Sequence, residues 1–244
     1  MGRLENQVAI ITGGSRGIGR AVALAFAREG ACVAIAGVED REALESVEKE
    51  IIALDANAMA VLANVARRGD VDRLVQSVIA QWGRIDILVN NAGVLHLAPL
   101  EKISEERWDD TLGVHLKGTF NCTQAVLPFM KQQRKGKIIN LAAPSALRGS
   151  YGVADYAAAK GGIIAFTRNA ASELKSWNIQ VNCISPTANT RMTEALTDFR
   201  REHLGIARRE REFLAPEAVA PAFVFFACSD SDYVSGQLLE VGRI

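Results

Sequence analysis

The chain has 244 residues and a mass of 26.3 kDa, enough to bury a sizeable hydrophobic core in one domain. Its 28 lysine and arginine residues balance its 28 aspartate and glutamate residues, so composition gives no electrostatic reason to expect nucleic acid or a membrane surface as a partner. The first residues resemble no secretory signal, and there is no run of about 18 apolar residues that could cross a bilayer, so we expect a cytoplasmic protein.

Short β-branched runs alternate along the chain with longer stretches of helical period. This alternation predicts an α/β fold, one doubly wound domain over residues 1–244 with a seven-stranded parallel sheet flanked by helices on both faces. Strands are expected at 8–11, 33–36, 58–62, 87–89, 137–141, 181–184 and 238–241. Helices are expected at 18–28, 41–54, 70–81, 104–132 with a bend near Gly113 or Gly118, 154–176 and 216–228.

Four segments follow predicted strands directly, at 12–19, 90–93, 142–149 and 186–190. Ligands of doubly wound sheets bind beyond the carboxyl ends of the strands, so we expect these segments to meet at one edge of the sheet. The first segment is rich in glycine and opens a helix, an arrangement that holds the pyrophosphate of a dinucleotide against free backbone N–H groups. A glycine turn used only for packing is the alternative, and the Asn-Asn-Ala-Gly sequence after another strand argues against it.

Four short motifs carry a resemblance to a known family: TGGSRGIG at 12–19, NNAG at 90–93, YAAAK at 156–160 and VSGQ at 234–237. Over nearly its whole length the chain resembles a short-chain dehydrogenase/reductase (SDR). The resemblance implies a Rossmann-type fold, a nicotinamide cofactor and interconversion of a ketone and a secondary alcohol. It also implies these cofactor-binding residues: Gly13, Ser15, Arg16, Gly17, Ile18, Gly19, Gly37, Asn64, Val65, Asn91, Ala92, Gly93, Tyr156, Lys160, Pro186 and Thr187.

The choice between NAD and NADP depends on the end of the second strand, where family members that use NAD usually carry an aspartate. This chain has Gly37 there, and Arg16 could reach a 2′-phosphate, which favours NADP. Glu39 and Asp40 add two acids close by, so the preference for NADP over NAD is slight. Asn64 stands where the family commonly has an aspartate that receives the adenine amino group, and an amide can still accept that bond.

Tyr156 and Lys160 are four residues apart, on one face of a predicted helix. A neighbouring ammonium favours phenolate, so we expect Lys160 to lower the pKa of Tyr156 toward neutrality. By resemblance, Tyr156 exchanges a proton with the oxygen of the substrate and Lys160 also holds the nicotinamide ribose. A surface pair is the alternative, and the small residues at 157–159 argue against it because they let a bulky cofactor approach the helix.

Two positions depart from the catalytic pattern of the family. Ala143 stands thirteen residues before Tyr156, where the family has a serine that shares the substrate oxygen, and losing such a donor costs about 10²–10³ in turnover. Three hypotheses remain open: Ser145 supplies the missing hydroxyl, Ala143 was introduced by substitution to trap a complex, or the catalytic activity of the chain is impaired. His115 stands 41 residues before Tyr156, where an asparagine usually organises a proton relay. A neutral imidazole can hold a water, and at its usual pKa it could take part in the relay directly; a purely structural histidine is the alternative.

The segments 113–120 and 185–193 resemble 3-hydroxyacyl-CoA dehydrogenase modules more than acyl-carrier-protein reductases, which usually have Pro-Gly where this chain has Pro186 and Thr187. We therefore expect a 3-oxoacyl or 3-hydroxyacyl thioester, or a similar small carbonyl compound, as substrate. The long segment 187–214 should form a lid over it. Its arginines could bind the phosphates of a CoA thioester: Arg191, Arg200, Arg201, Arg208, Arg209 and Arg211. The acids between them favour the alternative, a solvated helix face on which these charges pair with one another: Glu194, Asp198, Glu202, Glu210 and Glu212.

By resemblance, the chain should form a homotetramer through the helices at 104–132 and 154–176 and the last strand, or a heteromer with an SDR paralogue. Because several family residues are replaced, a non-catalytic subunit of a hetero-oligomeric hydroxyacyl-CoA dehydrogenase is the competing function. No pair of histidine, cysteine or carboxylate residues has metal-ligand spacing, so we expect no metal. The scattered cysteines without a C-x-x-C pair predict buried thiols in a reducing compartment: Cys32, Cys122, Cys183 and Cys228.

Overall fold

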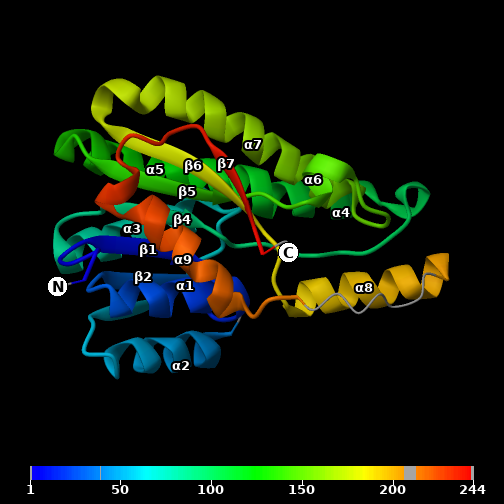
Figure 1. Cartoon of the computed structure of the whole chain (residues 1–244), viewed down its shortest axis with the longest axis horizontal. Helices are drawn as coiled ribbons and strands as arrows, with labels where there is room; N and C mark the ends of the chain where they lie inside the picture. Colours follow the sequence, from blue (N-terminus) through cyan, green and yellow to red (C-terminus); the bar gives the residue numbers. More distant parts are fainter. Residues whose placement is uncertain (1, 39, 206–212, 243–244) are drawn as a thin grey trace.

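Seven parallel strands form one sheet, in the order β3-β2-β1-β4-β5-β6-β7 (Figure 1). The computed structural model describes residues 2–38, 40–205 and 213–242. All seven predicted strands are present, so the expected α/β fold is confirmed. Strand order reverses between β1 and β4, and doubly wound sheets bind their ligands at the carboxyl ends of the strands at such a point. The strands are β1 (Val8–Thr12), β2 (Cys32–Gly37), β3 (Ala58–Leu62), β4 (Ile87–Asn90), β5 (Gly136–Leu141), β6 (Ile179–Pro186) and β7 (Leu238–Val241).

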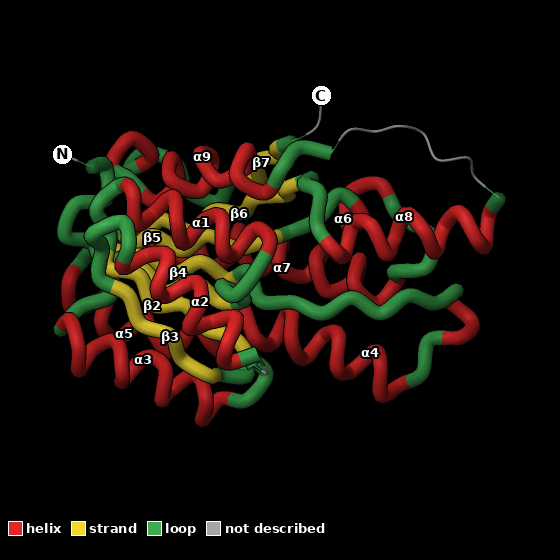
Figure 2. The backbone as a smooth tube through the Cα atoms, turned by 90° about the horizontal axis from the view of Figure 1, so that it is seen from below, coloured by secondary structure: helices red, strands yellow, loops and turns green. Residues whose placement is uncertain are grey.

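Helices cover both faces of the sheet, as Figures 1 and 2 show. The first face carries α1 (Gly17–Arg28), α2 (Arg41–Ile52) and α9 (Pro216–Ala227), and the second carries α3 (Arg68–Trp82), α5 (Gly118–Gln133) and α7 (Ala154–Leu174). The remaining helices are α4 (Glu105–Leu112), α6 (Ser145–Arg148) and α8 (Arg191–Leu204), with 3-10 turns at Leu100–Lys102, Lys175–Trp177 and Ser229–Ser231.

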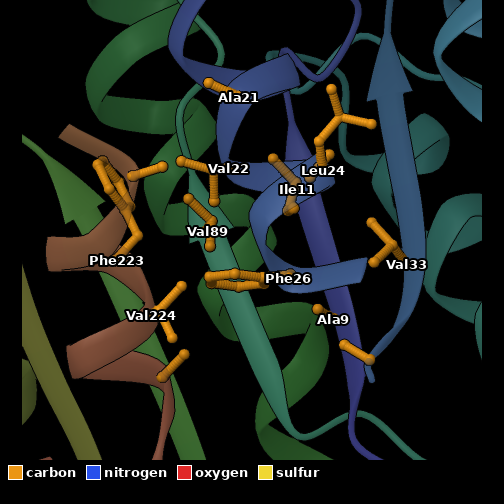
Figure 3. Packing of buried hydrophobic residues seen from close by; sticks show 14 of the residues in the cluster. Ala9, Ile11, Ala21, Val22, Leu24, Phe26, Val33, Val89, Phe223 and Val224 are labelled. Atoms are coloured by element: carbon orange, nitrogen blue, oxygen red, sulfur yellow. The ribbon is translucent and has the colours of Figure 1, made fainter. Parts of the chain in front are cut away.

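The hydrophobic core has two halves because successive side chains of a strand point to opposite faces. In β1, Ala9 and Ile11 pack under α1 and α9, whereas Val8 and Ile10 pack under the helices of the other face. Figure 3 shows the first half, in which Phe26 of α1 lies among the strands and α9. Phe26 is fully buried, and burial of such a ring contributes about 1.5–3 kcal/mol.

The expected helix at 104–132 is divided into three parts, which refines the predicted bend. A π-helical turn (Gly113–Lys117) separates α4 from α5, and a glycine lies at each of its junctions. Such turns are found mostly inside α-helices and frequently at functional sites. This one contains His115, so the irregularity lies at a residue that the sequence marked as a candidate.

Two helices were not among the predicted elements. α6 is a single turn after Pro144, and α8 occupies much of the segment expected to be a lid. The hydroxyl of Thr190 caps the start of α8 by accepting the backbone N–H of Thr193, and Gly205 ends it with a φ of 61°. The cations and acids expected at 206–212 lie outside the described residues: Arg208, Arg209, Glu210, Arg211 and Glu212.

Three of the four cysteine thiols, those of Cys122, Cys183 and Cys228, are buried, and Cys32 is half-buried. All four are free thiols, and the prediction of burial is confirmed for three of them and wrong for Cys32. Within residues 2–38, 40–205 and 213–242, no helix is long and apolar enough to cross a bilayer, and no three histidine, cysteine, aspartate or glutamate side chains cluster as metal ligands would.

Candidate active site

The glycine turn and the Asn-Asn-Ala-Gly segment form one hydrogen-bonded unit at the carboxyl ends of β1 and β4. Thr12 Oγ1 accepts the backbone N–H groups of Asn91 and Ala92, both at 3.0 Å. Asn91 Nδ2 donates to the carbonyl oxygens of Thr12 and Gly13 at 2.8 and 2.9 Å. Both amide hydrogens of Asn91 are therefore used on the turn, and its side chain sets the shape of the turn.

Two glycines are required in this turn for different reasons. Gly13 has a φ of 66°, in the left-handed region that side chains disfavour. A Cβ on Gly19 would overlap the carbonyl oxygen of Gly13 and the amide of Asn91. The start of α1 can therefore pack against the turn only when residue 19 has no side chain.

The start of α1 has the features of an anion site. Gly17 has a φ of 54°, and a Cβ there would meet only Thr190 Cγ2, at 3.7 Å. Arg16, the N-cap residue, makes no side-chain cap, and the first turn contains no acid. The first N–H groups of a helix have no partner within the helix, so they are available to an anion here. The pyrophosphate of a dinucleotide fits this open, uncapped turn, which Ser15 and Ile18 flank.

Gly19→Ala should raise the Kd for NAD(P)H at least tenfold, roughly 1.4 kcal/mol, because the new methyl forces the turn apart. Cofactor fluorescence titration measures this change, and far-UV circular dichroism checks that the fold is kept. Gly69→Ala is the matched control, since a Cβ there would meet only Arg73 Nη1, at 3.8 Å. An unchanged Kd in Gly19→Ala would contradict the assignment of the turn to the cofactor.

A cation and an acid meet near the carboxyl end of β2: Arg16, the N-cap of α1, and Asp40, the N-cap of α2. Arg16 Nη2 lies 3.4 Å from Asp40 Oδ2, and both side chains are about half exposed. Such pairs contribute about 0–1 kcal/mol, so the guanidinium is easily redirected to another anion. Gly37 ends β2, and a Cβ there would meet the Leu44 side chain at 3.3 Å; Glu39 lies outside the described residues.

Asn64 and Val65, at the end of β3, are held in a local turn. The Asn64 side-chain oxygen accepts the backbone N–H of Ala66 at 2.9 Å, and Asp70 accepts the backbone N–H of Asn64 at 2.9 Å. Val65 is buried against the second face of the sheet, and Asn64 is half-buried. An amide oxygen has two lone pairs, so that of Asn64 retains one for a further donor.

Tyr156 and Lys160 lie in the first two turns of α7, where Tyr156 is half-buried and Lys160 is buried. Lys160 is only 4% exposed, which excludes the alternative of a surface pair. Its Nζ donates to the carbonyl oxygen of Leu141 at 2.8 Å and lies 5.5 Å from the centroid of the Tyr156 ring. The pair therefore joins α7 to the carboxyl end of β5.

The expected lowering of the Tyr156 pKa is not found. Burial raises the pKa of Tyr156 to about 12 and lowers the pKa of Lys160 to about 8. The physical reason is desolvation, which disfavours the charged form of each group, and the ammonium is directed at a carbonyl oxygen rather than at the phenol. Tyr156 thus carries its proton at neutral pH, the state that a proton donor needs.

His115 lies against both the Asn-Asn-Ala-Gly segment and Tyr156. Its Nε2 is 2.8 Å from the carbonyl oxygen and 3.2 Å from the backbone nitrogen of Val94, and a Cβ on Gly93 would overlap the imidazole. The rings of His115 and Tyr156 meet edge to face, with centroids 5.0 Å apart. Burial, followed by the charge of Lys160, lowers the pKa of His115 to about 3, so the imidazole is neutral.

One nitrogen of His115, Nδ1, has no hydrogen-bond partner among the residues that the structure describes. Nδ1 is buried and makes no hydrogen bond within the described part of the chain. A buried polar atom is normally satisfied by protein or by an ordered water. Nδ1 is therefore suited to hold a water, whereas an imidazolium relay near neutral pH conflicts with the lowered pKa.

Ala143 lies in the loop after β5 and is buried, with 6% of its surface exposed. Ser145, two residues on, begins α6, and its Oγ is buried without a hydrogen-bond partner among the described residues. It makes no hydrogen bond to Tyr156, so the structure does not pair the two hydroxyl groups.

A buried amide network below the site escaped the sequence reasoning. Asn90 Nδ2 donates to Asn140 Oδ1 at 2.8 Å and to Thr123 Oγ1 at 3.2 Å. Asn140 Nδ2 in turn donates to Thr167 Oγ1 at 2.9 Å. The network links β4, β5, α5 and α7. The available signal was an asparagine at or next to the end of each of two adjacent apolar strands.

The segment after β6 borders the same edge of the sheet. The backbone N–H of Thr187, next to Pro186, donates to the carbonyl oxygen of Val241 at 2.8 Å. In α8, which extends beyond the sheet in Figure 1, Phe199 stacks on Tyr151 with centroids 6.0 Å apart, and Gly152 leaves the space for the Phe199 ring. These contacts place α8 over the loop that follows β5.

The arginines of α8 show some pairing with acids of the same helix, as the alternative of a solvated, self-paired face requires. Arg201 lies 3.2 Å from Asp198 in an exposed pair one turn apart on α8. Arg191 is exposed at the first turn of the same helix. Arg200 differs from these two, because it is half-buried and its Nε is buried without a hydrogen-bond partner among the described residues.

Three comparisons place the chain among known proteins. The profile of the short chain dehydrogenase family matches residues 7–201. A 3-oxoacyl-(acyl-carrier-protein) reductase of Thermotoga maritima is 42% identical over 240 residues, covering 98% of this chain and 97% of that protein. The BbsD subunit of a (2S)-((R)-hydroxy(phenyl)methyl)succinyl-CoA dehydrogenase of Thauera aromatica is 38% identical, covering 98% and 96%.

A solved structure agrees with these sequence matches. The crystal structure of levodione reductase superposes with a TM-score of 0.88 at 28% identity, over 98% of this chain and 97% of that one. The motifs of the glycine turn, the Asn-Asn-Ala-Gly segment and the Tyr-Lys pair are thus accompanied by similarity along the whole chain. The chain belongs to the short-chain dehydrogenase family of oxidoreductases.

Proposed function

We propose that this chain is an NAD(P)-dependent reductase that interconverts a 3-oxoacyl thioester and the corresponding 3-hydroxyacyl thioester. The observation that carries the proposal is the placement of Tyr156, half-buried and protonated at neutral pH, 5.5 Å from the Nζ of the buried Lys160, at the same edge of the sheet as the open glycine turn. The names of two relatives support the substrate class, because one is a 3-oxoacyl reductase and the other a subunit of an acyl-CoA dehydrogenase.

The chemistry divides between the cofactor and the chain. A nicotinamide cofactor held by the glycine turn, by residues 90–93 and by Lys160 supplies the hydride. Tyr156 donates its phenolic proton to the ketone oxygen, and the ammonium of Lys160 stabilises the phenolate that remains. A water on His115 Nδ1 is suited to return a proton to this pair.

We further propose that residues 187–214 act as a lid over the substrate, with α8 seated on the loop after β5. The thioester carrier would lie along this segment, where exposed arginines are present. For assembly we propose a homotetramer through α5 and α7, or a heteromer with a paralogous chain. The outward-facing ring of Phe120, 43% exposed and 6.5 Å from Phe166 of α7, supplies apolar area for such contacts.

Asp40→Asn should lower the Kd for NADPH about threefold, roughly 0.7 kcal/mol, and leave the Kd for NADH unchanged. The substitution removes the acid that now pairs with Arg16, and asparagine keeps the N-cap of α2, where the Asp40 carboxylate accepts the N–H of Ala43 at 2.9 Å. Arg16→Gln is the opposite test and should weaken NADPH alone. If it leaves the NADPH Kd unchanged, the preference for NADP is wrong.

The function is tested by following the absorbance of NADPH and NADH with a series of 3-oxoacyl-CoA and acyl-carrier-protein thioesters. We expect NADPH oxidation that depends on the thioester. Binding of nucleotide without turnover of any thioester would instead favour the second candidate, a non-catalytic subunit of a hetero-oligomeric dehydrogenase. Ala143 is the specific observation that favours this candidate, together with the similarity to a dehydrogenase subunit.

A further inference from the structure

A buried charged cluster lies directly beside the candidate proton donor. Asp155, the residue before Tyr156, has no exposed surface. Its Oδ2 lies 3.1 Å from Arg107 Nε and accepts the Thr111 hydroxyl at 3.1 Å. Its Oδ1 accepts the backbone N–H of Tyr156 at 2.9 Å. The carboxylate thus joins α4 to the first turn of α7.

The guanidinium of Arg107 also reaches a third element. Its Nη2 donates to the carbonyl oxygen of His96 at 2.8 Å, in the loop between β4 and α4. α4 itself continues into the π-helical turn that carries His115. The Arg107–Asp155 pair therefore ties together the elements that bring the rings of His115 and Tyr156 to 5.0 Å.

Stability alone is a weak reason for such a pair. The cost of removing two charges from water offsets most of their attraction, so buried ion pairs contribute little net stability. They do fix geometry, because Arg107 is only 15% exposed and both its Nε and its Nη2 have defined partners, as do both oxygens of Asp155. A side chain that must deliver a proton depends on such geometry, since a displacement of about 1 Å can cost 10²-fold in rate.

We propose that Arg107 and Asp155 form a positioning pair that holds Tyr156 in its catalytic orientation against His115. The inference rests on the proposed function of Tyr156 as proton donor. Neither member of the pair touches the reacting atoms; both act through the backbone of Tyr156 and through α4.

The chain contains a matched control for this pair. Asp86, 2% exposed, accepts the backbone N–H of Val8 at 2.9 Å and pairs with Arg84, whose Nε lies 2.8 Å from its Oδ2. This is the same chemistry, a buried aspartate with one backbone donor and one arginine. It lies just before β4, at the edge of the sheet opposite the candidate site.

The experiment compares Asp155→Asn, Arg107→Met, the double variant and Asp86→Asn. Steady-state kinetics with NADPH and a 3-oxoacyl-CoA give kcat and KM, and titration gives the NADPH Kd. Because the chain has three histidines, carbon-13 labelling at histidine Cε1 gives a resolvable NMR signal for His115, assigned with His115→Asn. That signal reports the ring geometry independently of turnover.

We expect each single variant at the pair to lower kcat about tenfold. The double variant should lower kcat by no more than either single variant, because the effects of removing two partners of one interaction are not additive. In these variants KM and the NADPH Kd should stay within about twofold of the unaltered chain, and the His115 signal should shift. The control Asp86→Asn should change neither kcat nor the His115 signal. An unmoved His115 signal, or an equal loss of kcat in Asp86→Asn, would overturn the proposal.

If the unaltered chain turns over no thioester, the proposed function fails, and the His115 signal still decides whether the pair positions Tyr156. If Asp155→Asn does not fold, Thr111→Val removes one hydrogen bond to the same carboxylate and takes its place. It should shift the His115 signal in the same direction by a smaller amount. No shift in a folded Thr111→Val would count against the positioning role.

Discussion

Replacing Ala143 with serine should raise the turnover of a 3-oxoacyl-CoA about 10²- to 10³-fold, the usual effect of one donor on a developing oxyanion. Ala143 is buried in the loop after β5, on the edge that also carries Tyr156 and Lys160. In the family a hydroxyl at this position shares the substrate oxygen with the tyrosine, and a methyl group cannot. Initial rates at saturating NADPH measure the gain, which should appear in kcat more than in KM.

Two further variants make this result specific. Ala142→Ser adds the same hydroxyl one residue earlier, where Ala142 packs against Ile163, Ile164 and Cys183, and should give no gain. Ser145→Ala removes the buried, unpartnered Oγ that is the other candidate donor. If Ser145→Ala abolishes turnover and Ala143→Ser adds nothing, Ser145 already supplies the hydroxyl. If every variant binds nucleotide and is inactive, the chain is a non-catalytic subunit.

Much of the fold could be predicted because its signals are local. Each strand is a short apolar run with a turn or helix start after it, and seven such runs separated by helical stretches specify a parallel doubly wound sheet. The π-helical turn in Gly113–Lys117 was less accessible. Glycines predict a bend, but its type depends on how His115 packs against Val94 and Gly93, which no local pattern contains.

The candidate site shows the same division between local and long-range signals. The glycine turn and the spacing of Tyr156 and Lys160 lie in short motifs, so the sequence identified them. The partners of Asp155 are 44 and 48 residues away on another helix, and only the packing of α4 against α7 brings them together. The prediction that the pKa of Tyr156 is lowered was wrong for a related reason. Sequence spacing gives the distance to a cation but not the depth of burial, which raises this pKa.

Tyr156→Phe should lower kcat by about 10²- to 10⁴-fold, the range that a positioned proton donor contributes. Phenylalanine keeps the ring that contacts His115 and lies near Lys160, so only the proton donor is lost. The Kd for NADPH should therefore stay within about twofold, roughly 0.4 kcal/mol. Single-turnover kinetics with preloaded NADPH separate the loss of chemistry from any change in binding.

Tyr233→Phe is the control for Tyr156→Phe, because the Tyr233 side chain is 84% exposed and its phenol should not affect turnover. The decisive comparison is Tyr156→Phe in the Ala143→Ser background. A serine hydroxyl stabilises an oxyanion but is too weak an acid to protonate it alone, so the gain from Ala143→Ser should disappear when Tyr156 is lost. If the double variant keeps that gain, the proton comes from another group, and the assignment of Tyr156 as the donor is wrong.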